Sequence, residues 1–227
     1  MNLKKRMAAG LLAFALAFGL CACATGGGES VEETETRVPE TAEPIDSALR
    51  NDYTDDETTR DAIEALQSSF VGLEEASAEA FSYVLENGAI TITKYNGEAA
   101  QVRVPERIDG APVVAIADAA FSDSTALRSL YLPDGIQTVG EGILASCKQL
   151  EALRTSCLGA NAEADWFLGY LFGAKKYTDN PVAIPASLAY LELGGMEQIP
   201  DFALFDCNDL ICIKLSESIR EIGTYAL

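Results

Sequence analysis

The residue types that usually carry catalysis are scarce in this chain. It contains no histidine, which removes the commonest general base and the commonest transition-metal ligand. The adjacent carboxylates Asp55 and Asp56 could in principle serve a glycosidase, but a disordered acidic segment holds no fixed carboxyl separation. Calcium binding by the cluster from Asp52 to Glu57 is conceivable, although a turn glycine and a spaced ligand series are absent there. We therefore predict a protein that is not an enzyme and uses no cofactor or metal.

The six cysteines are the remaining candidates for chemistry. Cys147 and Cys207 recur at one position of a repeat, where Ser124 stands in another copy, so we expect a small buried filler there rather than a bridge or a ligand. Cys157 and Cys212 lie outside that position. The sequence leaves open whether these two form a disulfide or stay free.

The amino terminus has the pattern of a secretory signal. Three basic residues, 4–6, precede an apolar run over residues 7–22. That run is shorter than the roughly 20 residues that a membrane-spanning helix needs. We therefore predict that residues 1–22 are a signal peptide.

The end of this run, Leu20-Cys21-Ala22-Cys23, resembles the lipobox of bacterial lipoproteins. The resemblance implies that the signal is removed and that Cys23 becomes the lipid-bearing first residue. Cys21 fits less well, because Phe18 would then hold the leucine position. Two or more acyl chains anchor a protein firmly, so the implied location is the extracellular face of a bacterial cell membrane. An ordinary cleaved signal and an uncleaved anchor are the alternatives.

Residues 23–57 form an acidic stretch that is rich in Glu, Thr, Asp and Pro. Such a composition buries too little apolar surface to offset the entropy cost of ordering the chain. We interpret the stretch as a disordered tether, a solvated spacer rather than a specific acidic binding tail. The formal net charge of -19 also makes nucleic acid a poor partner.

A repeat of apolar and small residues organises the carboxyl-terminal part of the chain. Matching positions fall 5, 8, 11 and 14 residues after a first Ile or Val. The copies are Ile116, Phe121, Ser124, Leu127 and Leu130; Val139, Leu144, Cys147, Leu150 and Leu153; and Ile199, Leu204, Cys207, Leu210 and Ile213. A copy that opens at Ile222 is incomplete at Leu227. First positions 116 and 139 lie 23 residues apart, as do 199 and 222.

This regularity predicts a solenoid of roughly 23-residue coils with short parallel strands, a β-dominated α/β fold. Leu130 and Leu132 alternate with Ser129 and Tyr131, as in a strand with one buried face. A further unit is visible at Leu188, Leu191 and Leu193, which match Leu127, Leu130 and Leu132. We place the solenoid at residues 81–227, with an insertion at about 156–186.

The segments before the first repeat have their own patterns. Residues 58–80 contain a short amphipathic helix, with Ile63, Leu66 and Phe70 at helical spacing. An isolated helix of this length is marginal, so we expect it to pack on the open end of the solenoid.

Two strand-like runs, 81–85 and 89–95, flank the turn signal Asn87-Gly88 and predict a hairpin. A third run follows at 102–104. These pieces are positioned to cover the exposed edge of the first repeat.

The repeats resemble the BspA-like leucine-rich repeats of bacterial surface proteins. The resemblance rests on the spaced residues above, on Ala120-Phe121 and Pro133 in the first copy, and on a block with Leu168-Gly169-Tyr170-Leu171-Phe172-Gly173-Ala174 and Ile184-Pro185-Ala186-Ser187-Leu188. It covers about residues 81–227. It implies a leucine-rich-repeat fold and a role in adhesion or binding, without a shared active site.

Two groups of residues are candidates for binding. The first is an aromatic patch in the insertion, Trp166, Phe167, Tyr170 and Phe172, which could stack on a sugar or anchor a protein. Packing of the same residues onto the coils is the favoured interpretation, because apolar blocks of this size seldom stay exposed. The second is the outward row of the strands, represented by Arg128, Tyr131, Arg154 and Lys214, since solenoids commonly bind through such a row.

Together these observations predict a lipid-anchored cell-surface protein that presents a leucine-rich-repeat solenoid to an extracellular protein or polysaccharide. The alternative is that the chain is the amino-terminal spacer of a longer surface protein, whose remaining part carries an enzymatic or wall-binding module. Ligand identity and oligomeric state are not predicted by the sequence.

Overall fold

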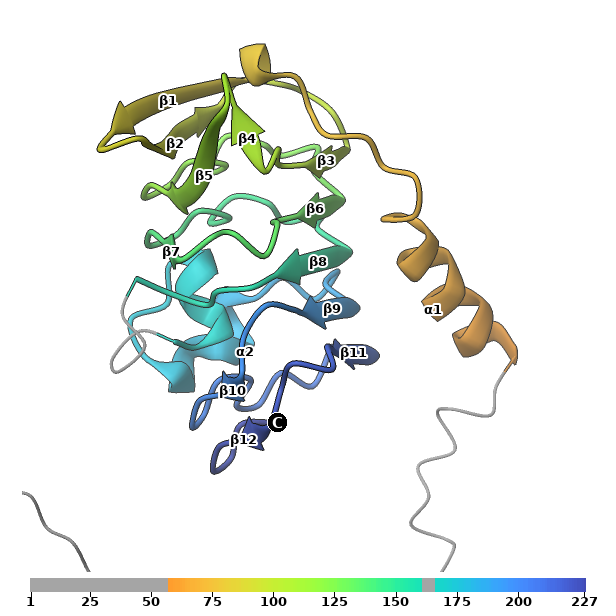
Figure 1. Ribbon diagram of the computed structural model, residues 1–227. Helices are drawn as coiled ribbons and strands as arrows, with labels where there is room; N and C mark the ends of the chain where they lie inside the picture. The colour runs from red at the N-terminus through yellow and green to blue at the C-terminus, as the bar shows by residue number, and fades with distance from the viewer. Residues whose placement is uncertain (1–56, 161–165) are drawn as a thin grey trace, which may run out of the picture. The chain divides into compact units, whose positions relative to one another are not determined.

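Two ladders of short strands lie on opposite sides of a stack of turns in this computed structural model (Figure 1). The structure describes residues 57–160 and 166–227. These residues all belong to the second of two units into which the chain divides, Arg50–Leu227. The predicted signal peptide, Cys23 and the tether up to residue 56 lie outside the described residues. Within the described ranges, no helix is long and apolar enough to cross a membrane.

The first ladder is a five-stranded sheet in which all neighbouring strands are parallel. In spatial order its strands are β3 (Gln101–Arg103), β6 (Ser129–Tyr131), β8 (Ala152–Thr155), β9 (Tyr190–Leu193) and β11 (Cys212–Leu215). Leu130, Leu153, Leu191 and Ile213 stand at one level of this sheet. The predicted match of Leu191 to Leu130 is therefore confirmed. Paired residues of β6 and β8, such as Ser129 and Ala152, lie 23 residues apart (129 to 152).

The second ladder contains the remaining strands. Its larger sheet consists of β1 (Phe81–Glu86), β2 (Ala89–Tyr95), β5 (Ala111–Ile116), β4 (Arg107–Ile108) and β7 (Thr138–Val139), and a separate pair consists of β10 (Gln198–Ile199) and β12 (Glu221–Ile222). Ile116 pairs with Val139, and Ile199 pairs with Ile222. The first positions of the sequence repeat thus stack on one another in two pairs.

One repeat position adopts a left-handed backbone in every copy. It lies three residues after the first position and is occupied by Ala119, Gly142, Phe202 and Tyr225, with φ of 56°, 62°, 59° and 52°. Glycine is the residue that takes this conformation without a steric cost. Two of the other residues are held there by hydrogen bonds between turns, from Ala119 N to Glu141 O at 3.0 Å and from Phe202 N to Thr224 O at 3.0 Å.

The hairpin predicted from Asn87-Gly88 is confirmed. Strands β1 and β2 are antiparallel, and the two turn residues have φ of 52° and 79°, as expected for a tight hairpin turn. Strand β2 then pairs in parallel with β5. The hairpin therefore covers the edge that the first repeat would otherwise expose.

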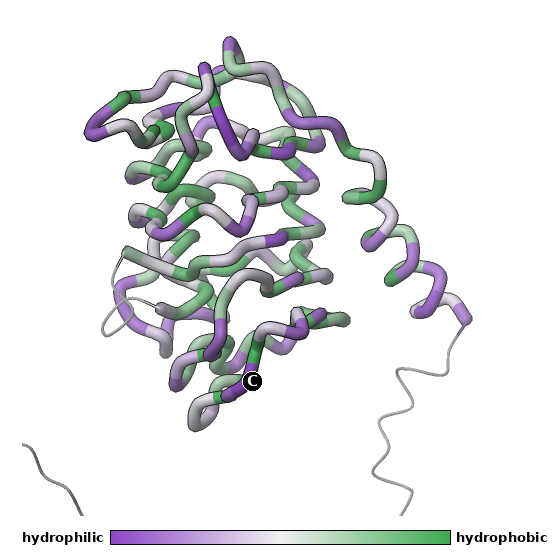
Figure 2. The backbone as a smooth tube through the Cα atoms, viewed as in Figure 1, coloured by the Kyte–Doolittle hydropathy of each residue, from purple (hydrophilic) through white to green (hydrophobic). Residues whose placement is uncertain are grey.

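The helix of the predicted stretch 58–80 is α1 (Glu57–Ser68), and a single turn, η3 (Ala78–Ala80), follows later. Polar and apolar residues alternate along α1 (Figure 2). The Ser69 hydroxyl donates to Leu66 O at 2.6 Å, just after the helix ends. Hydroxyl groups that bond the local backbone compete with helix continuation. This bond favours the end of the helix at Ser68.

The expected packing of this helix was wrong. Leu66, Phe70 and Leu73 pack on Ala152 and Tyr190 of the first ladder rather than on the open end of the stack. Figure 1 shows α1 on the side of the first ladder, where it contacts β9. The aromatic rings of Tyr131 and Tyr190 stand on that side of the ladder, and Phe70 buries its ring against them.

The insertion supplies turns of the stack. It contains η4 (Leu168–Phe172), η5 (Tyr177–Asp179) and α2 (Asn180–Ala183). Gly142 N and Leu144 N donate to Tyr170 O and Leu171 O at 2.9 and 2.8 Å, and Leu168 N donates to Ala203 O at 2.8 Å. Because it is hydrogen-bonded on both sides, η4 continues the ladder of turns between the second and third copies of the repeat.

Candidate binding face

Five side chains form a continuous row across the first ladder. Strand register aligns Arg103, Tyr131, Arg154, Glu192 and Lys214, one from each strand. We call them the charged row. Tyr131, Arg154 and Lys214 were predicted to lie on this face. Arg103 and Glu192 were missed, since β3 precedes the first repeat and β9 follows the insertion.

Arg154 is the centre of the charged row, and only 7% of the residue is exposed. Its guanidinium donates to Leu132 O at 2.8 Å, to Asp134 Oδ1 at 2.6 Å and to Glu192 Oε1 at 3.3 Å. Three hydrogen bonds, two of them to carboxylates, satisfy a buried cation whose removal would leave its partners unpaired. Arg154 is therefore occupied in holding adjacent turns together.

Tyr131 is enclosed by its neighbours. The guanidinium carbons of Arg103 and Arg154 lie 4.3 and 4.4 Å from the centre of its ring, as in cation–π contacts. The Phe70 ring meets Tyr131 edge-on, with centroids 5.8 Å apart. Because these groups surround the ring, Tyr131 does not offer a free stacking surface.

Glu192 joins the centre of the row to its end. Its Oε2 accepts hydrogen bonds from the Tyr190 hydroxyl at 2.9 Å and from Lys214 Nζ at 3.1 Å. Burial tends to raise the pKa of Glu192. The hydrogen bonds from Lys214 and Tyr190, with the charges of Lys214 and Arg154, outweigh burial and hold that pKa below its ordinary value. Burial also raises the pKa of the Tyr190 phenol.

The accessible cations lie at the margins of this face. The side chains of Arg128 and Lys214 are 51% and 55% exposed. Arg128 pairs with Glu151, and Lys214 pairs with Glu192. The Arg128–Glu151 pair is exposed on both sides and contributes little to stability, so a partner can recruit Arg128 at small cost. Lys214 is as exposed as Arg128, but its partner Glu192 is only 19% exposed.

A second row of the same sheet is covered. It consists of Ser129, Ala152, Tyr190 and Cys212. Ser129, Ala152 and Tyr190 are at most 3% exposed, although the alternation of the strand directs them outward. Phe70 covers Tyr190, with ring centroids 6.0 Å apart. Residues 66–73 therefore occupy the middle of the face that the sequence predicted to be open.

The aromatic patch of the insertion is largely packed, as the favoured interpretation held. Phe167 and Phe172 are each 5% exposed, whereas Trp166 and Tyr170 are partly buried against the core. The Phe167 and Tyr170 rings meet edge-on at 6.1 Å. Only Trp166 and Tyr170 keep surface that a ligand could reach.

The four cysteines of the described residues are free. Cys147 is fully buried, as expected of a filler, and its thiol donates to Phe121 O at 3.3 Å. The Cys157 thiol bonds Gly159 O at 3.0 Å. Burial raises the pKa of Cys147 to about 11 and that of Cys207 to about 12. These two thiols are therefore protonated at neutral pH and are poor nucleophiles.

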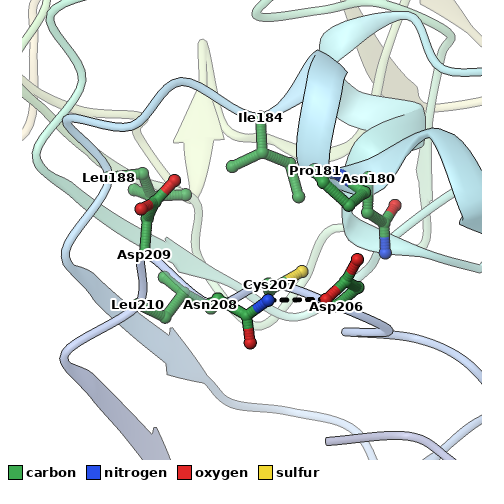
Figure 3. Close-up of a pocket in the computed structure, with 9 residues that line it drawn as sticks. All are labelled: Asn180, Pro181, Ile184, Leu188, Asp206, Cys207, Asn208, Asp209 and Leu210. Carbon is green, nitrogen blue, oxygen red and sulfur yellow. Dashed lines mark hydrogen bonds between the residues drawn. The ribbon is translucent and has the colours of Figure 1, made fainter.

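A small cavity separates α2 from the turn after β10 (Figure 3). Its volume is about 130 Å³, below the roughly 300 Å³ from which ligand pockets begin. Ile184, Leu188 and Leu210 line it, and Asn208 at its rim donates to Asp206 Oδ1 at 2.5 Å. The described residues contain no group of three potential metal ligands.

A family model matches the repeats of the chain. Residues 104–163 and 186–227 match the family model of the BspA type leucine rich repeat region, in 6 copies. This match supports the family resemblance seen in the sequence. No curated protein matches the chain.

Three solved structures are similar to the chain at low identity. The Treponema pallidum leucine rich repeat protein is 21% identical over 66% of this chain and 86% of that one, with a TM-score of 0.36. A leucine rich cell surface protein from Faecalibacterium prausnitzii is 16% identical over 69% of this chain and 46% of that one, with a TM-score of 0.41. A leucine-rich repeat protein from Bacteroides capillosus is 12% identical over 66% and 96%, with a TM-score of 0.32.

Proposed function

We propose that this protein is a bacterial surface lipoprotein that presents its repeats, as a solenoid of roughly 23-residue coils, to an extracellular protein partner. The outward face of the first ladder, which we call the strand face, supports this proposal because two exposed cations, Arg128 and Lys214, lie at the margins of its buried centre. Pre-organised charges cost little to order on binding and steer association. A polysaccharide is a second possible ligand. The alternative role as the spacer of a longer surface protein stays a prediction.

Binding through the strand face is tested with two matched double variants. Lys94 is a suitable control for Lys214, because its side chain is 53% exposed and pairs with Asp123 at 2.8 Å. Lys175 is exposed and pairs with Glu141, and so matches Arg128. We expect Arg128→Gln with Lys214→Gln to weaken binding to a panel of purified extracellular proteins by about tenfold. Lys94→Gln with Lys175→Gln should leave binding unchanged. Equal binding by both double variants would exclude the strand face.

Lipid anchoring at Cys23 is tested separately by labelling cells with radioactive palmitate. We expect the label to enter the wild-type protein and the Cys21→Ser variant but not Cys23→Ser, because the lipobox resemblance assigns the lipid to Cys23. Equal label in the Cys23→Ser variant would contradict the anchor without bearing on the strand face.

A further inference from the structure

A cavity beside Trp166 has the components of a sugar-binding site. Its volume is about 350 Å³, within the range of small-ligand pockets. Its wall includes Asp134, Gln137, Trp166, Gly195, Glu197 and Gln198. These residues come from the turn after β6, from the chain just before η4, and from the turn after β9 with the first residue of β10. Three segments far apart in the sequence therefore meet there.

The aromatic wall is supplied by Trp166, the only tryptophan of the chain. It is partly buried against the core and also lines the cavity. In the described part of the chain, the Trp166 ring contacts no other aromatic ring, whereas the Phe167 ring meets that of Tyr170 edge-on. A fixed indole surface at a cavity wall suits the apolar face of a pyranose ring, and its N–H suits a hydroxyl.

The carboxylate of Asp134 is paired with the buried guanidinium of Arg154. Arg154 donates to Asp134 Oδ1 at 2.6 Å, which fixes that carboxylate and leaves its other oxygen to accept from a ligand. Gly195 has a φ of 68°, and a Cβ there would lie 2.9 Å from the Ser156 side chain. Glycine therefore lets the loop approach Asp134 closely. Because Arg154 is itself buried, the carboxylate is held in place before any ligand arrives.

The remaining groups select the charge of the ligand. Gln137 and Gln198 are exposed and can donate and accept hydrogen bonds through their amides. Glu197 adds a carboxylate, which repels anionic sugars. The charge of Asp134 is compensated by Arg154, so a cationic ligand gains little from it. Acceptors and amides around one indole fit a neutral sugar.

We propose that this cavity binds one neutral pyranose unit of an extracellular polysaccharide, with Trp166 stacking on the ring and Asp134, Gln137 and Gln198 bonding its hydroxyls. The site adds a ligand to the proposed surface function and does not depend on the strand face or on the lipid anchor.

The single tryptophan makes the test direct. The protein is titrated with cellotriose, maltotriose, laminaritriose and chitotriose to about 10 mM, a range that detects millimolar dissociation constants, and Trp166 emission is recorded. We expect at least one trisaccharide to change the emission saturably. Gln198→Ala should weaken that binding about three- to tenfold. Gln101→Ala, an exposed glutamine on β3 away from the cavity, should leave it unchanged.

Calorimetry completes the experiment, because it measures binding without a tryptophan signal. In the Trp166→Ala variant, the heat of sugar binding should disappear. Thermal melting should show that this variant is folded. Unchanged emission with all four trisaccharides would overturn the proposal. Equal weakening by Gln198→Ala and Gln101→Ala would also overturn it. None of these results depends on the protein panel used for the strand face, so the two proposals fail separately.

Discussion

Strands β8 and β11 occupy equivalent places in the repeat but differ in burial. All four residues of β8 are buried, whereas β11 has three half-buried residues and one exposed residue. Strand β8 lies between β6 and β9, while β11 has only β9 beside it. The same repeat position is thus structural in the middle of the ladder and accessible at its end. Neighbouring strands decide which residues hold the fold and which remain available to a partner.

The largest difference in stability between substitutions in β8 and in β11 should come from their core-facing residues, Leu153 and Ile213. Leu153 is fully buried, and Leu153→Ala should lower the free energy of unfolding by about 3 kcal/mol through lost transfer energy and a residual cavity. Ile213, at the same level of β11, is half-buried, so Ile213→Ala should cost about 1 kcal/mol. Equilibrium denaturation measures both. Equal losses would show that position in the stack does not set the energy.

The charged row should show the same contrast between centre and end. Arg154→Ala should lower the free energy of unfolding by about 3 kcal/mol, because Leu132 O, Asp134 and Glu192 lose a buried partner. Lys214→Ala should cost less than about 1 kcal/mol, since this lysine is exposed. Chemical denaturation of the two variants checks this. A loss for Lys214→Ala as large as that for Arg154→Ala would contradict it.

The reactivity of Cys212 tests whether residues 66–73 shield the strand face. Phe70 is buried on the face that holds Cys212, whereas Val71 is 81% exposed. Phe70→Ala should loosen residues 66–73 and speed alkylation of Cys212 by about tenfold, measured by mass spectrometry of the labelled peptide. Val71→Ala is the matched control and should leave the rate unchanged. An unchanged rate in Phe70→Ala would show that this segment does not shield the face.

The smallest effect concerns the pH dependence of stability. The pKa of Glu192 in the folded protein lies below its ordinary value of 4.5. The contribution of ionised Glu192 to folding stability is therefore fully present above pH 4.5 and is lost as pH falls through the folded pKa. Glu192→Gln should therefore flatten this acid-side loss when unfolding free energies are compared across that range. If the variant and the wild type lose stability in parallel, Glu192 is not a source of the dependence.

Much of the ladder could be predicted from the sequence because its residues recur at fixed offsets. Leu130, Leu153 and Ile213 follow from spacing alone, and Asn87-Gly88 predicts the hairpin. These signals are local or strictly periodic. The matched positions of Leu191 and Leu130 show that the pattern survives an insertion of irregular length.

The candidate sites were less predictable, because they depend on contacts between distant segments. Spacing places Tyr131 and Arg154 on the outward face. It does not show that Phe70 covers Tyr131 or that Asp134 pairs with Arg154. Arg103 and Glu192 belong to strands outside the three clear copies. An arginine that alternates with buried leucines is predicted to be exposed from its position in the strand. Its burial depends on hydrogen-bond partners from other turns, which the spacing does not indicate.

Hydrogen–deuterium exchange, resolved by strand, tests the central claim most directly. If neighbouring strands decide which residues are structural, the amides of β6, β8 and β9 should exchange slowest, those of β11 faster, and those of α1, which has no buried residue, fastest of all. Protection of β11 or α1 equal to that of β8 would contradict the distinction between a structural centre and accessible margins.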